Sequence, residues 1–147
     1  MEKAIWTLGY EGADVAAFVA TLQAAGIQRV VDVRERPLSR KKGFSKNVLA
    51  EHLDAADIAY ENRKRLGAPP EIRNPYKAGG SWETFAAAFE ARLDGAPEAL
   101  AGLARTAQEE RVCLVCFEAD AGACHRSLVA ARLAPLGFKV HDLRCNL

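Results

Sequence analysis

Short apolar runs alternate with helical patterns along this sequence, and that alternation restricts the folds open to it. The apolar runs lie at residues 4–8, 29–33, 58–60, 112–117 and 139–143. The helical patterns lie between them, at 14–25, from Ser45, from Ser81, from Pro97 to about Glu109, and at 125–136. Strands that alternate with helices predict a mostly parallel sheet covered on both faces. We therefore expect an α/β fold, formed as a single three-layer, Rossmann-like domain over residues 1–147.

Residue types that start and stop helices support these boundaries. Ser45 and Ser81 are suitable N-caps, and Pro97 suits a first helical turn. Gly26 and Gly137 follow the first and last helical patterns, where a terminator is common. Residues 67–80 contain three prolines and a Gly-Gly pair, which predicts a long irregular loop.

Composition and charge exclude some classes of protein. The chain has 147 residues, half of them hydrophobic, which is enough to bury a core. Its net charge of +1 argues against binding nucleic acid through bulk charge alone. Residues 1–6 lack the pattern of a signal peptide, and no apolar run reaches the length of a membrane span. We expect a cytoplasmic protein without membrane contact.

Four cysteines, Cys113, Cys116, Cys124 and Cys145, fall in the last third of the chain. In a reducing cytoplasm we expect free thiols, metal ligands or catalytic groups rather than structural disulfides. Cys113 and Cys116 have the spacing of a zinc ligand pair, with Cys124 and His125 downstream. Residues three apart in a strand point to opposite faces, however, so we expect no metal site.

The most informative segment is a buried strand, a polar loop and a helix start, residues 113–127. Backbone amides at that helix start, with His125 and Arg126 beside them, suit an anion. The same surroundings should lower the pKa of the Cys124 thiol. Cys116 lies deeper, where burial should keep its thiol neutral, so we expect Cys124 to be alkylated first. Glu118 follows Cys116 into the loop and is a candidate acid or base.

A second candidate segment is basic and follows the strand at 29–33. Asp32 ends that strand, and six cations crowd residues 34–46 against the single carboxylate of Glu35. We expect phosphate contacts from Arg34, Ser39, Arg40 and Lys41, and binding that salt weakens. The alternative is a solvated basic loop.

The third segment, Gly9-Tyr10-Glu11-Gly12, lies between the first strand and the first helix. Tyr10 could stack on a ring, and Glu11 could act as a base or bind a hydroxyl. The glycine spacing is not a dinucleotide fingerprint, so we expect no such cofactor. Ligands of parallel sheets bind beyond the carboxyl ends of the strands. We therefore expect one pocket to join five residues of the three segments, Glu11, Asp32, Arg34, Glu118 and Arg126.

With these motifs in place, the chain resembles a bacterial and archaeal family, domain of unknown function 488. The resemblance runs nearly end to end. It rests on residues 7–12, Val31-Asp-Val-Arg34, residues 37–40 and 43–46, Leu66-Gly67, Cys116-Phe-Glu118 and Cys124-His-Arg126. The family's usual Leu-Gly-Gly stands here as Leu66-Gly67-Ala68. The resemblance implies a fold and a site at these polar motifs, without implying a reaction.

Our leading functional hypothesis is an enzyme acting on a phosphate-bearing small molecule or nucleic acid. It would hydrolyse a glycosidic or phosphoester bond, with Glu118 or Glu11 as acid or base. Cys116 or Cys124 could be a nucleophile, although carboxylates alone would suffice. One alternative is a nucleotide or nucleic-acid binding module without turnover. Another is a redox sensor that forms a Cys116–Cys124 disulfide. No cofactor is expected, and the sequence identifies no protein partner.

Overall fold

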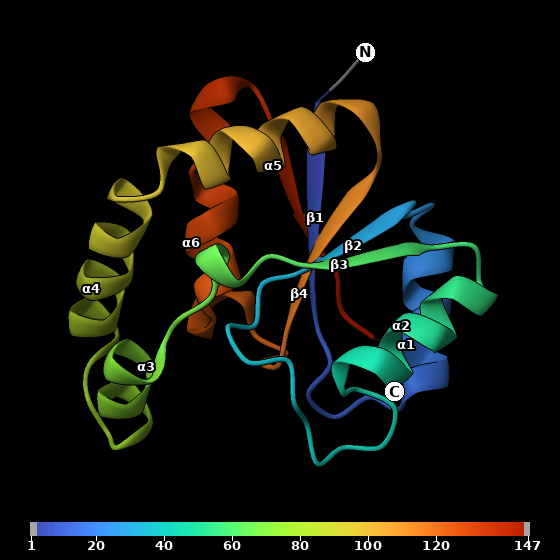
Figure 1. Cartoon of the computed structure of the whole chain (residues 1–147), viewed down its shortest axis with the longest axis horizontal. Helices are drawn as coiled ribbons and strands as arrows, with labels where there is room; N and C mark the ends of the chain where they lie inside the picture. Colours follow the sequence, from blue (N-terminus) through green and yellow to red (C-terminus); the bar gives the residue numbers. More distant parts are fainter. Residues whose placement is uncertain (1–2, 146–147) are drawn as a thin grey trace.

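A computed structural model describes residues 3–145 of the chain (Figure 1). The strands are β1 (Ala4–Gly9), β2 (Arg29–Asp32), β3 (Ala59–Asn62), β4 (Val112–Cys116) and β5 (Lys139–Asp142). The helices are α1 (Val15–Ala24), α2 (Lys46–Ala55), α3 (Pro70–Lys77), α4 (Trp82–Asp94), α5 (Pro97–Glu109) and α6 (His125–Ala131). Short 3₁₀ turns lie at Lys64–Leu66, Ala121–Ala123 and Ala134–Leu136. Strands and helices alternate except that α3, α4 and α5 follow one another between β3 and β4, and the fold is α/β as expected.

The five strands form one sheet in the order β3-β2-β4-β1-β5, and every pairing is parallel. Strand β4 is central, between β2 and β1. The register places Gly9 beside Cys116 and Asp32 beside Val115. The carboxyl ends of the three middle strands therefore meet at one edge, and the loops that leave them can form a common site.

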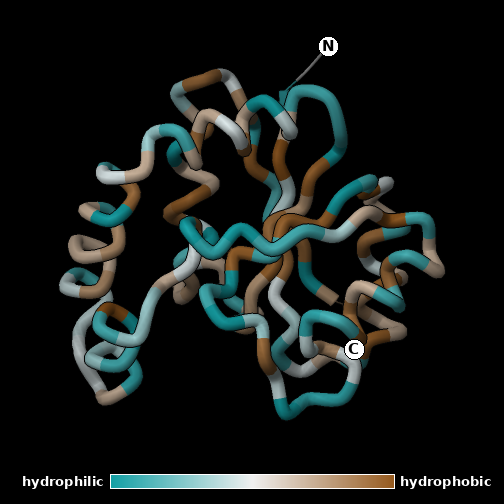
Figure 2. The backbone as a smooth tube through the Cα atoms, viewed as in Figure 1, coloured by the Kyte–Doolittle hydropathy of each residue, from teal (hydrophilic) through white to brown (hydrophobic). Residues whose placement is uncertain are grey.

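Two apolar clusters, one on each face of the sheet, hold the helices in place. On one face, Phe18 of α1 and Leu49 of α2 pack with Leu8. On the other face, the apolar sides of α4, α5 and α6 pack with Ile5 and Leu114. Figure 1 shows α1 and α2 on one side of the strands and α3, α4 and α6 on the other. The most hydrophobic backbone in Figure 2 runs through the crossing strands at the centre.

Most of the expected helix signals are confirmed at the atomic level. The Ser81 hydroxyl accepts a hydrogen bond from the amide of Thr84 at the start of α4. Pro97 occupies the first turn of α5. Ser45 precedes α2 but makes no side-chain cap, because its hydroxyl bonds the backbone of Ser39 instead.

Two expectations about helices are wrong. Residues 67–80 are not a long irregular loop, because α3 occupies most of them. Pro70 lies in its first turn, where a missing N–H costs nothing. The last helix is also shorter than expected: α6 ends at Ala131 and a 3₁₀ turn follows. Pro135 disfavours the α conformation at the residue before it, which accounts for the break.

Within residues 3–145, no helix combines the length and apolar character needed to cross a bilayer.

Candidate functional site

A pocket of about 300 Å³ opens at the carboxyl edge of the sheet. Its charged lining residues are Arg34, Glu35, Arg36, Arg73, Lys77 and Glu118, and its rings come from Tyr10, Tyr76, Phe85, Phe117 and His125. Leu38, Ala68, Cys116 and Ala123 complete the lining. The pocket therefore combines cations, two carboxyl groups and several aromatic rings.

Asp32 and Arg34 form a buried ion pair at the back of the pocket. Asp32 is 0% exposed and accepts from the Arg34 guanidinium, at 2.7 Å from Nη2, and from the Tyr60 hydroxyl at 2.6 Å. Arg34 also donates to the Phe44 carbonyl at 2.7 Å. Burial opposes the charge of Arg34, but Asp32 raises the pKa of that guanidinium overall. These partners occupy Asp32 fully, so its carboxylate stabilises the loop after β2 and does not line the pocket.

Glu118 lies just past the end of β4, and its side chain reaches the pocket. Burial raises the pKa of its carboxyl above the usual range, although Arg126 and Lys77 act in the opposite direction. Its Oε2 atom is 3.7 Å from the Cys116 sulfur. A carboxyl with a raised pKa retains its proton closer to neutrality, as a general acid must.

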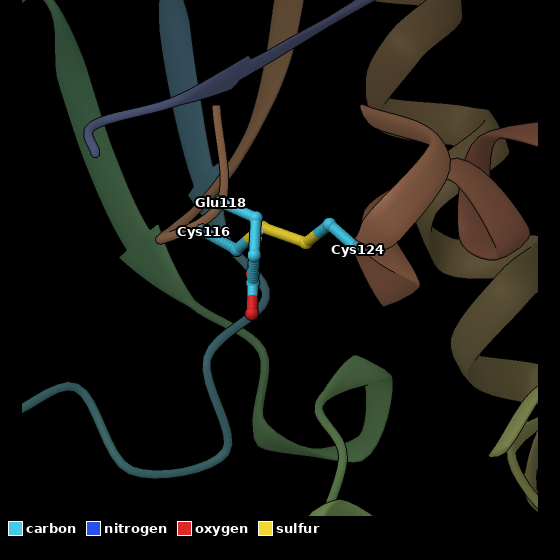
Figure 3. A group of neighbouring side chains, drawn as sticks. All are labelled: Cys116, Glu118 and Cys124. Carbon is cyan, nitrogen blue, oxygen red and sulfur yellow. Dashed lines mark hydrogen bonds between the residues drawn. A yellow bond between two sulfur atoms is a disulfide. The ribbon is translucent and has the colours of Figure 1, made fainter. Parts of the chain in front are cut away.

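Cys116 and Cys124 are joined by a disulfide beside Glu118 (Figure 3). The bond links the end of β4 to the residue before α6. The expectation of unpaired cysteines is thus wrong for these two in this structure. Cys113 and Cys145 are free. The loop of residues 117–123 brings the two sulfurs together, and sequence spacing alone does not show that closure.

The bond between Cys116 and Cys124 also determines whether a metal ion could bind to these cysteines. Cys113 and Cys116 pack in clusters on opposite faces of the sheet, as their strand spacing predicts. Ligand atoms of Cys116, Glu118 and Cys124 lie within 4.8 Å of one another. Because the two sulfurs are bonded to each other, this group offers no pair of thiolates to a cation in this state.

His125 donates a hydrogen bond from Nε2 to the Val33 carbonyl, at 2.6 Å. Burial lowers the pKa of the imidazole to about 4, so the ring is neutral at pH 7 and Nδ1 carries no proton. Nδ1 lies 3.9 Å from the Cys124 sulfur. His125 therefore lines the pocket as a neutral ring, and it does not place a positive charge beside Cys124.

Arg126 points inward rather than to a ligand. Its side chain is 0% exposed, is absent from the pocket lining, and donates to the Cys116 sulfur at 3.2 Å. It also donates to the carbonyls of Glu118 and Ala119. The expected effect of Arg126 on the Cys124 thiol therefore falls on Cys116 instead, because Cys116 is the sulfur that the guanidinium contacts.

The Gly9–Gly12 turn supports the site from behind. Tyr10 is buried, stacks on Phe44 at 4.4 Å between ring centroids, and shows only part of its surface to the pocket. Glu11 accepts a hydrogen bond from the amide of Ala119 and lines a separate, smaller hollow. Of the five residues expected in one pocket, Arg34 and Glu118 line it. Asp32 shares their sheet edge, whereas Glu11 and Arg126 brace the loop after β4.

The basic loop contributes less to the pocket than expected. Arg36 lines it, but Ser39, Arg40 and Lys41 do not. The Ser39 hydroxyl accepts from the Lys41 amide and so shapes the loop. Arg40 is exposed to solvent.

The pocket cations that sequence reasoning missed lie on α3. Arg73, Tyr76 and Lys77 are three and four residues apart, so they share one helix face. Tyr76 packs against Phe85 of α4, at 4.8 Å between centroids. The sequence spacing of Arg73, Tyr76 and Lys77 is typical of a helix, but the prolines around them favour a loop.

The parallel, five-stranded sheet of the described residues, covered by helices on both faces, defines an α/β protein with a charged and aromatic pocket at its carboxyl edge. The family model described as Domain of unknown function DUF488 matches residues 14–133, so the chain belongs to that family. Neither the search of curated proteins nor that of solved structures found a match.

Proposed function

We propose that the protein is a hydrolase that binds a nucleotide-class ligand in the pocket at the carboxyl edge of the sheet. The bond cleaved is a glycosidic or a phosphoester bond. The observation that carries the proposal is the position of Glu118: its carboxyl shares one pocket with three cations that have no acidic partner.

Those cations are Arg36, Arg73 and Lys77. Among residues 3–145 none of the three forms an ion pair, and the buried Nε of Arg73 has no hydrogen-bond partner. A phosphate group would supply an acceptor for the buried Arg73 Nε and a counter-charge for the exposed Arg36 and Lys77, through charge-assisted bonds. Binding through these three cations would weaken with salt.

The aromatic residues supply the second half of the recognition. Tyr76 and Phe85 form one wall, and Phe117, 45% exposed, stands at the rim. Aromatic rings stack on any planar base, so they bind a nucleotide without distinguishing one base from another. A ligand that carries both a phosphate and a planar ring fits this lining better than either group alone.

Glu118 is the proposed general acid that protonates the leaving group. Its buried position and raised pKa keep the proton on the carboxyl at higher pH than for an exposed glutamate. Turnover should therefore be highest below the raised pKa and fall as the pH increases through it.

The test is turnover of nucleoside monophosphates by the wild type and Glu118→Gln, followed as released base and as released phosphate. We expect the variant to lose about 100-fold in kcat, the usual contribution of a general acid, while it still binds. Glu35→Gln, which changes the other carboxylate of the pocket lining, is the matched control and should turn over as the wild type does. If no nucleotide is cleaved, or Glu118→Gln turns over as fast as wild type, the protein is not this hydrolase and a binding module remains.

A further inference from the structure

We propose that Cys116 is a thiolate in the reduced protein and is a site of oxidation by hydroperoxides, with Cys124 as the resolving thiol. The disulfide in the structure is the product of that reaction. This site lies at the floor of the pocket but needs no nucleotide.

Arg126 carries a buried positive charge at the disulfide. The guanidinium is fully buried, and among residues 3–145 no carboxylate lies within ion-pair distance of it. A buried cation without a counter-ion is costly. Its Nη1 donates to the Cys116 sulfur at 3.2 Å, and its remaining contacts are backbone carbonyls. In the reduced protein the anion that balances Arg126 is the Cys116 thiolate.

Cys124 differs from Cys116 in its titratable neighbours. Its nearest titratable neighbour is Nδ1 of His125, at 3.9 Å, which accepts rather than donates a hydrogen bond. Cys124 therefore keeps its proton, and His125 is placed to accept that proton when the sulfur attacks. Among residues 3–145, the titratable side chains that approach the two sulfurs within 4 Å are Arg126, Glu118 and His125, and Cys113, Asp142 and Asp120 act on the charge of Arg126 from further away.

The pocket gives small molecules access to the Cys116 sulfur. Cys116 lines the pocket although it is only 1% exposed, whereas Cys124 is not part of the lining. A molecule as small as a hydroperoxide reaches the Cys116 sulfur through the pocket, but a bulky protein thiol does not.

The chemistry balances with groups that are present. The Cys116 thiolate attacks a hydroperoxide oxygen and the O–O bond breaks. The alkoxide that leaves takes the Glu118 proton and departs as an alcohol, and Cys116 becomes a sulfenic acid. Cys124 then gives its proton to His125 and attacks the Cys116 sulfur. The S–S bond forms as the S–O bond breaks. The hydroxide that is released takes the proton from His125 and departs as water.

The test uses the full chain, reduced with dithiothreitol and then treated with hydrogen peroxide and dimedone. In Cys124→Ser the sulfenic acid has no resolving partner, so dimedone should label Cys116. In Cys116→Ser, labelling of Cys124 should be at least tenfold slower. Faster labelling of Cys124 would overturn the assignment.

A second measurement needs no variant. Reduced wild-type protein is alkylated with iodoacetamide across pH 5–9, and each cysteine is followed by peptide mapping. A free cysteine thiol is only a few per cent ionised at pH 7. If Cys116 is already a thiolate, its alkylation rate should stop rising with pH at least one pH unit lower than the rate of free cysteine does. A profile at or above that of free cysteine would contradict the proposal.

Discussion

Gly9 shows how closely the site is packed against the sheet. At this residue β1 passes beneath the loop that follows β4, and a Cβ atom would lie 1.7 Å from the Glu118 carbonyl oxygen. The same atom would lie 2.9 Å from the Arg126 guanidinium. Only glycine fits at this position, because a Cβ atom would clash with the Glu118 carbonyl, which accepts a hydrogen bond from Arg126.

Gly9→Ala should therefore destabilise the protein by about 3 kcal/mol, in the upper range for overpacking a core. Chemical denaturation followed by circular dichroism measures the change. Gly102→Ala is the control, because it lies in α5 and its Cβ would meet only arginine side chains at 3.6 Å or more. That control should gain roughly 0.5 kcal/mol from helix propensity. Equal effects of the two substitutions would show that the loop can move away from β1.

The residue types and strand ends of the site could be predicted from the sequence, but the partners of each side chain could not. Asp32 and Arg34 were both expected to face a ligand. Arg34 does line the pocket, but Asp32 does not, because their strand-end positions bring opposite charges within 3 Å in a buried place and Arg34 takes up the carboxylate. Which charges remain free for a ligand depends on that pairing, which only the folded chain decides.

At the scale of elements, α6 is tied to β2 through His125. The bond from Nε2 to the Val33 carbonyl joins the first residue of the helix to the loop after the strand. Burial holds the ring neutral, with a pKa of about 4 against an ordinary value of 6.5. The unfolded chain therefore binds a proton between pH 6.5 and 4 that the folded chain does not.

Stability should accordingly fall as the pH is lowered from 6.5 to 4, because the proton favours the unfolded state. The contribution of His125 should be roughly 2 kcal/mol, less than the full shift implies, since part of the ring faces the pocket. The free energy of unfolding of wild type and His125→Gln, measured at several pH values, gives this contribution as the difference in slope. His52→Gln, on the exposed side of α2, is the matched control. Parallel curves for wild type and His125→Gln would contradict the prediction.

The order of strands and helices could also be predicted, because apolar periodicity reports it directly. α3 could not, because prolines favour both turns and first helical turns. Its packing against α4, through Tyr76 and Phe85, outweighs the cost of Pro75 within the helix. The error concealed Arg73 and Lys77, two of the three free cations of the pocket.

At the scale of the whole molecule, the site depends on parallel topology. The ends of β1, β2 and β4 meet at one edge, and α3 closes the pocket from a segment near the middle of the chain. The acid and the cysteine pair come from residues 116–124 and the cations from Arg36 and from α3, so the site draws on three separate parts of the sequence. Neither the net charge nor any single motif reveals that convergence.

The most direct measurement is an NMR titration of the ¹⁵N-labelled protein with adenosine monophosphate. The account predicts amide shifts on α3 and after the ends of β2 and β4, and affinity about tenfold weaker in Arg73→Ala. Lys46→Ala, in the basic segment outside the pocket, should bind as the wild type does. Shifts confined to residues 39–46, or equal losses in the two variants, would contradict the account by placing phosphate on the exposed loop.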